Sequence, residues 1–323
     1  MRLGQSNRGV ALITVLLITA VITIIVATMA TQQSVDIRRT SNVIDRNQAY
    51  LFAEGAEGLA KYVLSQDTNN VDHRFEPWAI ELPPYEVEGG TISGYVRDMQ
   101  GCFNLNNLVE NGQGNAVEIA RFKQLLLVLE LDATLADAVV DWIDVDNQIT
   151  FPGGAESEYY ARLDAPYQIA NRTLLSASEL LNVKGVSAEV MATLRPYVCA
   201  LPSQTPTKIN VNFAPEPVLM TLAPGMTQSI AEAIIEARDT PSLTKLEPHF
   251  ETLNDMFAVP QLDALLDTNT ALQPSIENAF GVSSQYFMVV ANGRFGEADM
   301  LLYSLLERSG NTITTYYRAQ GSY

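Results

Sequence analysis

The chain has 323 residues, with 20 Lys and Arg against 37 Asp and Glu, and a formal net charge of −17. This length allows one large domain or two smaller ones, each with its own buried core. The acidic balance disfavours a nucleic-acid-binding protein, because such proteins bind phosphates mainly through Lys and Arg, and it favours the binding of divalent cations.

A long uncharged segment begins near the N-terminus. No side chain between Arg8 and Asp36 is charged, and about 20 apolar residues in a helix are enough to cross a bilayer. The run has no small-residue cleavage site of a secretory signal peptide at its end, so we expect a retained membrane helix over 10–31. The flanking charges, Arg2 and Arg8 before the span and Asp36 after it, predict a cytoplasmic N-terminus and a soluble part on the other side.

The helix is predicted to continue well beyond the membrane. Residues 36–65 contain no Pro, and Ile37, Ile44 and Leu51 recur at a spacing that places them on one helical face. We therefore predict a single helix over 10–65. Its amphipathic second half is expected to lie against a soluble domain, and its apolar first half to contact lipid or similar helices.

Two β-type regions flank a long helical region. The first surrounds residues 91–104, and the second covers residues 285–321. The second alternates apolar and polar side chains and has turn signals at Asn292-Gly293 and Gly310-Asn311, which predicts three antiparallel strands. Residues 110–280 between them are predicted to be helical with short loops. The pattern indicates an α+β fold with a helical insertion.

The helical region contains a weak internal repeat. Residues 177–198 and 217–238, offset by 40, each combine a short apolar helix, a glycine turn and a second helix, which is a helix-hairpin-helix pattern. In nucleic-acid-binding examples the hairpin amides contact a phosphate beside Lys or Arg. Here only Lys184 stands in the first hairpin, none stands in the second, and Glu residues surround both. We interpret the repeat as a helix-packing module.

The clearest chemical motif is an acidic loop, DWIDVDNQITFPGGAESEYY, at residues 141–160. Oxygen-bearing side chains alternate in its first half, and Gly153-Gly154 allows a turn that brings a later Glu back toward them. Such oxygens suit calcium, and without a cation the carboxylates would repel one another. The predicted ligands are Asp144, Asp146, Gln148 and Glu156, with Asp141 and Glu158 as second-rank candidates. The spacing is not that of an EF-hand, and the alternative is a solvated acidic loop in which Asp144 caps a helix.

The N-terminal sequence resembles the class III signal of type IV pilins and type II secretion pseudopilins. The resemblance is carried by Arg8-Gly9, the following Val10-Ala11-Leu12-Ile13-Thr14 and the long uncharged helix. It implies that a membrane-embedded prepilin peptidase removes residues 1–9 by cutting after Gly9, and then methylates the amino group of Val10.

One position departs from the family pattern. Most members have Glu at the fifth mature position, where it neutralises the ammonium group of the previously inserted subunit, whereas this chain has Thr14. Among pseudopilins this absence is typical of the K-type minor subunit at the tip of the type II secretion pseudopilus. The alternative is that Thr14 is simply a tolerated residue in a membrane anchor.

The rest of the chain is also similar to K-type minor pseudopilins, in which a pilin-like helix and sheet are interrupted by a large helical domain. DMQGCFNLNNL, at residues 98–108, and the acidic loop resemble segments of that family. The resemblance implies a calcium-binding helical domain with one or two ions. The predicted parts are a leader (1–9), the long helix (10–65), a pilin-like sheet (66–109 and 281–323), a first SAM-like helical insertion (110–206) and a second helix-hairpin-helix insertion (207–280).

The only cysteines are Cys102 and Cys199. If the chain beyond the membrane helix lies outside the cytoplasm, the two can form one disulfide, because such compartments are oxidising. The alternative is a pair of unpaired buried thiols.

Motifs for catalysis find little support. The only histidines, His73 and His249, belong neither to an H-E-x-x-H motif nor to a nucleophile elbow, and we expect both in loops or at the surface. We therefore predict a structural minor pseudopilin of the bacterial inner membrane with its soluble domain in the periplasm, where it initiates pseudopilus assembly and helps export folded proteins across the outer membrane. Its expected partners are other minor pseudopilins, the prepilin peptidase, the inner-membrane secretion platform and secreted cargo.

Two alternative functions remain at this point. The first is a membrane-anchored periplasmic enzyme that uses the acidic loop as a catalytic metal site, which would need an open coordination position. The second is a membrane-tethered DNA-uptake protein that uses the hairpins, and the net charge of −17 disfavours it.

Overall fold

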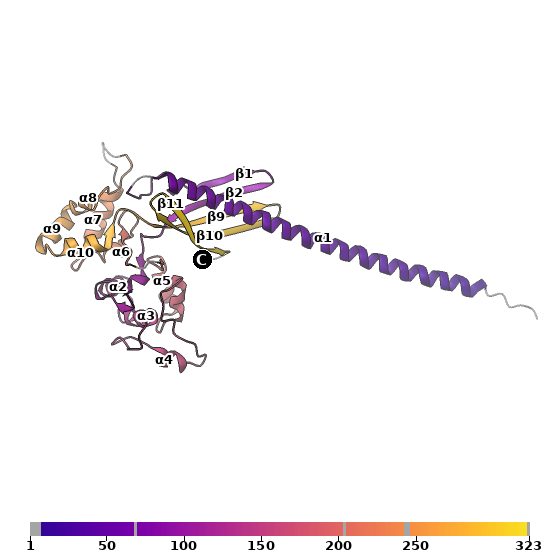
Figure 1. The fold of residues 1–323 in the computed structure, drawn as a ribbon, viewed down its shortest axis with the longest axis horizontal. Helices are drawn as coiled ribbons and strands as arrows, with labels where there is room; N and C mark the ends of the chain where they lie inside the picture. Colours follow the sequence, from indigo (N-terminus) through magenta and orange to yellow (C-terminus); the bar gives the residue numbers. More distant parts are fainter. Residues whose placement is uncertain (1–7, 68–69, 203–204, 242–245, 322–323) are drawn as a thin grey trace, which may run out of the picture.

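A single helix of 59 residues, α1 (Arg8–Gln66), dominates the shape of the molecule (Figure 1). The computed structural model describes residues 8–67, 70–202, 205–241 and 246–321, so residues 1–7 of the predicted leader lie outside the described residues. From Val10 to Ile44 every side chain of α1 is exposed, and burial begins only in its second half. The predicted continuous helix is therefore confirmed.

The first half of α1 is long and apolar enough to cross a membrane, with a mean hydropathy of 3.0 over its most apolar window. The hydroxyl groups of its threonines donate to carbonyl oxygens one turn earlier, as Thr14 does to Ala11 at 2.9 Å. Because these hydroxyls are satisfied within the helix, they do not oppose insertion into lipid.

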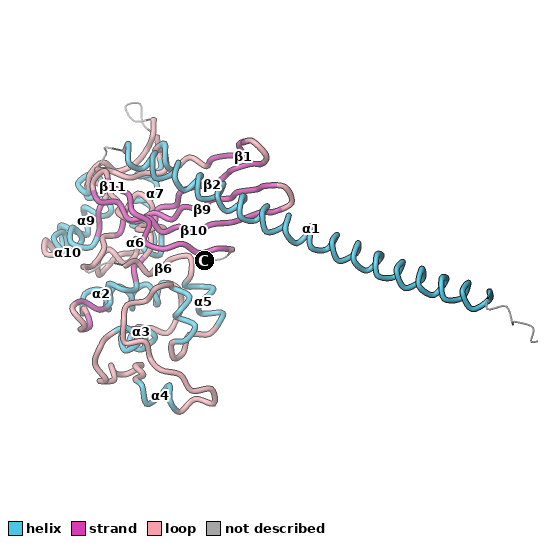
Figure 2. The backbone as a smooth tube through the Cα atoms, turned by 45° about the vertical axis from the view of Figure 1, so that its right-hand side comes forward, coloured by secondary structure: helices cyan, strands magenta, loops and turns pink. Residues whose placement is uncertain are grey.

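The predicted α+β fold is confirmed by a five-stranded antiparallel sheet. Its strands lie in the order β1-β2-β9-β10-β11, so that the two N-terminal strands pair with the three C-terminal ones across the whole helical insertion (Figure 2). The strands are β1 (Leu82–Val87), β2 (Gly90–Asp98), β9 (Tyr286–Phe295), β10 (Ala298–Ser309) and β11 (Thr312–Gln320).

One of the two predicted turns is wrong. Asn292-Gly293 lies inside β9, and the hairpin turns instead at Gly296, whose φ is +57°. Gly293 is needed for space, because a Cβ atom there would lie 2.1 Å from the carbonyl oxygen of Ala49 in α1. The turn predicted at Gly310-Asn311 is correct, since β10 and β11 meet there.

The second half of α1 packs on one face of the sheet. Small residues of the helix, Ala53 and Ala56, lie on Val289 and Ala291 of β9, and this core continues to Leu302 of β10. Small side chains on both surfaces allow the helix and the strands to approach closely. This packing fixes the direction in which the membrane segment leaves the sheet.

A buried carboxylate lies inside this interface. Glu57 of α1 is 1% exposed, and it accepts hydrogen bonds from Ser304 at 2.6 Å, Thr315 at 2.7 Å and Arg318 at 2.7 Å. Lys61, one turn further along α1, pairs with it at 2.7 Å. Burial by itself would raise the pKa of Glu57, but the hydrogen bonds, first that of Arg318, lower it to about 2.

The helical insertion forms two units, each closed by a pair of two-residue parallel strands. In the first unit β3 (Phe103–Asn104) pairs with β6 (Val198–Cys199), and in the second β7 (Ile209–Asn210) pairs with β8 (Phe280–Gly281). The first and last residues of each unit therefore lie side by side. This arrangement lets the chain leave the sheet after β2 and return at β9.

The first unit contains η2 (Leu105–Leu108), β4 (Val109–Glu110), β5 (Gln113–Gly114), α2 (Ala116–Val128), α3 (Leu135–Ile143), α4 (Ser157–Ala161), η3 (Ala177–Asn182) and α5 (Ala188–Leu194). The second contains α6 (Glu216–Leu219), α7 (Gln228–Asp239), α8 (Leu253–Phe257), α9 (Pro260–Thr268) and α10 (Leu272–Ala279), and η1 (Pro77–Ala79) precedes the sheet. The expectation of short loops throughout is wrong, because residues 144–156 and 163–176 form long loops. In these loops, hydrogen bonds from side chains replace helical hydrogen bonds for much of the backbone.

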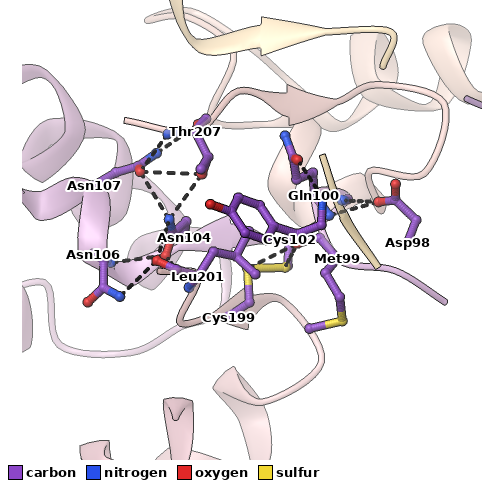
Figure 3. The surroundings of a disulfide bond; sticks show 12 residues. Asp98, Met99, Gln100, Cys102, Asn104, Asn106, Asn107, Cys199, Leu201 and Thr207 are labelled. Carbon is purple, nitrogen blue, oxygen red and sulfur yellow. Dashed lines mark hydrogen bonds between the residues drawn. A yellow bond between two sulfur atoms is a disulfide. The ribbon is translucent and has the colours of Figure 1, made fainter. Parts of the chain in front are cut away.

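Buried asparagines supply some of these hydrogen bonds at the base of the first unit (Figure 3). Asn104 accepts from the backbone N–H of Leu201 at 2.9 Å, and Asn106 donates to the carbonyl oxygens of Leu174 and Leu201 at 3.0 Å each. Cys102 and Cys199 are joined by a disulfide beside them, with their Cα atoms 5.9 Å apart. The disulfide and the β3–β6 pair close the first unit at the same point.

The structure contains the predicted internal repeat. η3 and α5 meet at Gly185, whose φ is +83°, and α6 and α7 meet at Gly225, whose φ is +89°. The hydroxyls of Ser187 and Thr227 cap the second helix of each hairpin by accepting a backbone N–H three residues later. The two hairpins therefore turn by the same local chemistry.

We predict that Glu57→Gln weakens the protein and flattens its acid sensitivity. The pKa of Glu57 is about 2 in the folded protein, against 4.5 for an ordinary Glu. The ionised carboxylate therefore contributes up to about 3 kcal/mol to the free energy of unfolding above pH 4.5, and this contribution is lost as the pH falls toward 2. Thermal melts of the full chain in detergent between pH 7 and pH 2.5 measure both effects. Glu54→Gln, at a half-buried neighbour on the same helix, is the control. An acid profile of Glu57→Gln identical to that of the wild type would contradict the assignment.

Candidate metal centre

Three carboxylates of the acidic loop meet between two helix ends. Asp144 follows α3 directly, and its N–H donates to the carbonyl oxygen of Val140 at 2.9 Å, while Glu156 immediately precedes α4. One carboxylate oxygen from each of Asp144, Asp146 and Glu156 lies within 4.8 Å of the other two. The fold therefore brings together residues that are up to 12 positions apart in the sequence.

Two buried aspartates of α3 shape the loop. Asp141 accepts the backbone N–H of Thr150 at 3.0 Å, and Asp137 accepts that of Gly153 at 3.2 Å. The N–H of Gly154 donates to the carbonyl oxygen of Thr150 at 2.7 Å, which closes the turn. These bonds fold the loop back onto the helix that precedes it.

The glycines in this turn are required for space. A Cβ atom on Gly154 would lie 2.2 Å from a carboxylate oxygen of Asp141, and one on Gly153 would lie 2.2 Å from the carbonyl oxygen of Thr134. Neither glycine has a positive φ. The Gly153-Gly154 turn thus forms as the sequence predicts, but the reason is close packing of the backbone.

Two carboxylates of the trio, those of Asp144 and Glu156, are buried and short of partners, whereas Asp146 is half-buried and accepts the backbone N–H of Gln148. Asp144 and Glu156 are each 4% exposed, and Asp144 Oδ1 and both carboxylate oxygens of Glu156 accept no hydrogen bond. Burial raises the pKa of Asp144 to about 7, with further increases from Asp146, Asp141 and Glu156, and burial likewise raises the pKa of Glu156. In the described parts of the chain, neither residue forms an ion pair with Lys or Arg.

This donor set fits a hard divalent cation. Calcium binds carboxylate and carbonyl oxygens at 2.3–2.6 Å, so oxygens on opposite sides of one ion lie roughly 5 Å apart. Buried carboxylate oxygens without a donor are costly, and a cation at their centre removes that cost. Asp144, Asp146 and Glu156 would hold such an ion, which would supply charge neutralisation and cross-link the two ends of the loop.

The other candidate ligands take different positions. Asp141 supports the loop from behind through Thr150. Glu158 is exposed and pairs with Arg162, so the structure places it outside the trio. Gln148 is also exposed, and its backbone N–H donates to Asp146 Oδ1 at 2.7 Å.

A second acidic trio, Asp67, Asp72 and Glu76, is not evident from the sequence. Arg308 of β10 pairs with Asp67 at 2.7 Å and also with Asp72, and it donates to the carbonyl oxygen of Ser284 at 2.7 Å. Burial raises the pKa of Asp72 to about 6 although Arg308 opposes this shift. Because Arg308 supplies the cation, this trio serves to attach the end of α1 to the sheet.

Both histidines lie in loops, as predicted, but their rings contact each other. His73 is buried, and its ring stacks on that of His249 with centroids 3.7 Å apart. The stack joins the segment after α1 to the loop before α8 in the second helical unit. Because 176 positions separate the two residues in the sequence, no local pattern reveals the contact.

Comparisons with known proteins agree with this architecture. The family model described as type II secretion system (T2SS), protein K, matches residues 101–203 and 209–276, and a PilX N-terminal model matches residues 8–56. These boundaries lie close to those of α1 and of the two helical units that the short strand pairs close. The family models therefore divide the chain where the structure does.

Several curated relatives are similar over most of their length. A type II secretion system protein K from Aeromonas hydrophila is 35% identical over 81% of this chain and 86% of that protein. Those from Pseudomonas aeruginosa and Pectobacterium carotovorum are 34% and 32% identical, over 95% and 98% of this chain and 90% and 97% of theirs.

A solved structure supports the same fold. One chain in the crystal structure of the GspK-GspI-GspJ complex from enterotoxigenic Escherichia coli superposes with a TM-score of 0.75, at 24% sequence identity, over 88% of this chain and all of that one. The family models, the relatives and this shared fold agree: the chain belongs to the protein K family of the type II secretion system, and is a minor pseudopilin.

Proposed function

We propose that this minor pseudopilin is the single subunit at the tip of the type II secretion pseudopilus, where it initiates assembly and helps export folded proteins across the outer membrane. In this proposal the first half of α1 is anchored in the bacterial inner membrane and the sheet and helical units lie in the periplasm. The role is structural, and the family assignment supports it.

The position of the helical units carries the tip proposal. The second unit lies beyond the end of the sheet that faces away from the membrane half of α1, and the first projects sideways near that end (Figure 1). In a filament, helices like α1 pack side by side, so repeated copies of such a wide head would collide. A single copy at the end of the filament avoids this collision.

The membrane half of α1 supports the same position. Thr14 donates its hydroxyl to Ala11 within its own helix, and it offers no carboxylate to the ammonium group of another subunit. A subunit that is inserted first has no predecessor whose charge it must neutralise. Thr14 is therefore compatible with initiation and unsuited to repeated addition.

The proposed partners are other minor pseudopilins, the prepilin peptidase, the inner-membrane platform and secreted cargo. The similar E. coli chain was crystallised in a complex with GspI and GspJ, which supports the first of these. The exposed apolar side chains in the first half of α1 are suited to the membrane and to sister helices.

We further propose that the trio binds calcium in a structural role. The unpartnered oxygens of Asp144 and Glu156 support a bound cation, and their low exposure favours a closed site over a catalytic one, which needs an open position for substrate. Whether one or two ions bind depends on further oxygen ligands from the loop. The bound ion would stabilise the first helical unit.

Processing tests the pilin assignment. The mature chain is expected to begin at Val10 with a methylated amino group, because the uncharged run starts directly after Arg8-Gly9. Mass spectrometry of protein purified from the native membrane measures the N-terminus. An intact Met1, or a cut after residue 28 or later, would refute the assignment.

Calcium is expected to raise the thermal midpoint of the full chain in detergent. At calcium 100-fold above Kd, ligand binding adds about 2.7 kcal/mol to stability. The double variant Asp144→Ala, Asp146→Ala should fold but show the same midpoint in calcium and in chelator. As the control, Asp263→Ala with Asp267→Ala removes two exposed carboxylates of α9 and should respond like the wild type. Equal wild-type midpoints with calcium and chelator would exclude the site.

The tip position predicts hetero-oligomers of defined size. The soluble domain, residues 42–323, is expected to bind other minor pseudopilin domains and to remain monomeric alone, because one copy terminates the filament. Light scattering of the domain alone and in mixtures measures this. Self-assembly into long oligomers, or failure to bind every minor pseudopilin tested, would argue against the tip proposal.

A further inference from the structure

Lys184 connects the first hairpin to the acidic loop. Its ammonium group donates to the carbonyl oxygens of Gly153 at 3.1 Å and Gly154 at 3.0 Å. Its backbone N–H donates to the hydroxyl of Tyr160 at 3.2 Å, and the ammonium lies 5.3 Å from the ring centre of Tyr159. Lys184 therefore contacts both the loop turn and the helix α4 that follows it.

The two carbonyls that Lys184 holds lie just before Glu156. In the described structure neither carboxylate oxygen of Glu156 accepts a hydrogen bond that would hold it in place. Its position is instead set by the backbone on each side, which Lys184 holds at Gly153-Gly154 and, through Tyr160, in α4. Hydrogen bonds from an ammonium group to carbonyl oxygens are charge-assisted, and stronger than neutral ones.

The second hairpin provides an internal comparison. Its residue at the corresponding place, 40 positions later, is Pro224, which has no donor at all. The hairpin still forms, with the same positive φ at Gly225 and the same type of helix cap. The turn itself thus does not require Lys, which occurs only in the hairpin that faces the acidic loop.

We propose that Lys184 is a positioning residue for the metal centre: the first hairpin holds the loop so that Glu156 faces Asp144 and Asp146. This inference rests on the calcium site proposed above. The lysine that a nucleic-acid-binding hairpin would direct at a phosphate here binds two carbonyl oxygens of its own chain. By linkage, calcium binding in turn stabilises the hairpin.

The proposal and simple charge repulsion predict opposite changes in calcium affinity when Lys184 is removed. A nearby ammonium group repels a cation, so its removal without any positional effect would tighten calcium binding. If Lys184 positions the loop, its removal weakens binding instead, because Glu156 loses its fixed place. Loss of an outer residue that orients ligands typically weakens metal affinity by about tenfold or more.

Calorimetric calcium titrations of the full chain in detergent test this. Lys184→Met is expected to raise the Kd for calcium by about tenfold. Lys184→Arg keeps the charge and the donors, so it should retain most of the affinity. Lys208→Met changes an exposed lysine of the second unit and should match the wild type. Unchanged or tighter binding by Lys184→Met, or equal weakening by Lys208→Met, would overturn the proposal. If the wild type binds calcium but the variants behave in either of these contrary ways, only the role of Lys184 is rejected. If the wild type does not bind calcium, the site itself is rejected.

Hydrogen exchange on the wild type gives a second measurement, which stands even if Lys184→Met does not fold. Calcium is expected to slow exchange at the amides of Lys184 and Gly154 at least as much as at other amides of the first unit, with no change at Gly225 in the second hairpin. Protection confined to residues 144–148 would show that calcium does not couple to the hairpin, and would overturn the proposal.

Discussion

The close crossing of α1 over the sheet determines how the rest of the molecule is placed. The helix can approach β9 only because Gly293 has no side chain at the crossing, and the buried carboxylate of Glu57 then binds β10 and β11 from the helix side. A one-residue slip of either element would leave that carboxylate buried without its donors, which is costly. The membrane segment, the sheet and everything attached to the sheet are thereby oriented together.

The helical units are added to this scaffold with little effect on it. Each is closed by a short parallel strand pair, and the first also by the disulfide between Cys102 and Cys199. Buried asparagines such as Asn104 bind loop backbone that no helix or strand satisfies. A chain that leaves and re-enters at one point can carry a large insertion, and the sheet can still pair β2 with β9. This is how a pilin-like core carries two large helical units.

The two acidic trios show how the surroundings decide the use of the same side chains. In the trio of Asp67, Asp72 and Glu76, Arg308 pairs with both aspartates, so a protein cation stabilises the group and the result is a structural junction. Asp144, Asp146 and Glu156 form no such ion pair in the described structure, and the buried oxygens of Asp144 and Glu156 that accept no hydrogen bond support the proposed cation. The nearby Lys184 binds carbonyl oxygens and leaves the carboxylates available.

The sequence by itself determined the continuous helix, the α+β class, the hairpin repeat and the acidic loop, because each depends on local spacing or residue type. Tertiary structure alone decided what depends on distant contacts. Gly293 suggested a turn, yet it serves the crossing of α1. Glu158 is a second-rank candidate for the ion site from the sequence, yet it pairs with Arg162 one turn away. Likewise, the stack of His73 on His249 and the contact of Lys184 with the loop depend on packing between elements far apart in the chain, and packing leaves no local pattern in the sequence.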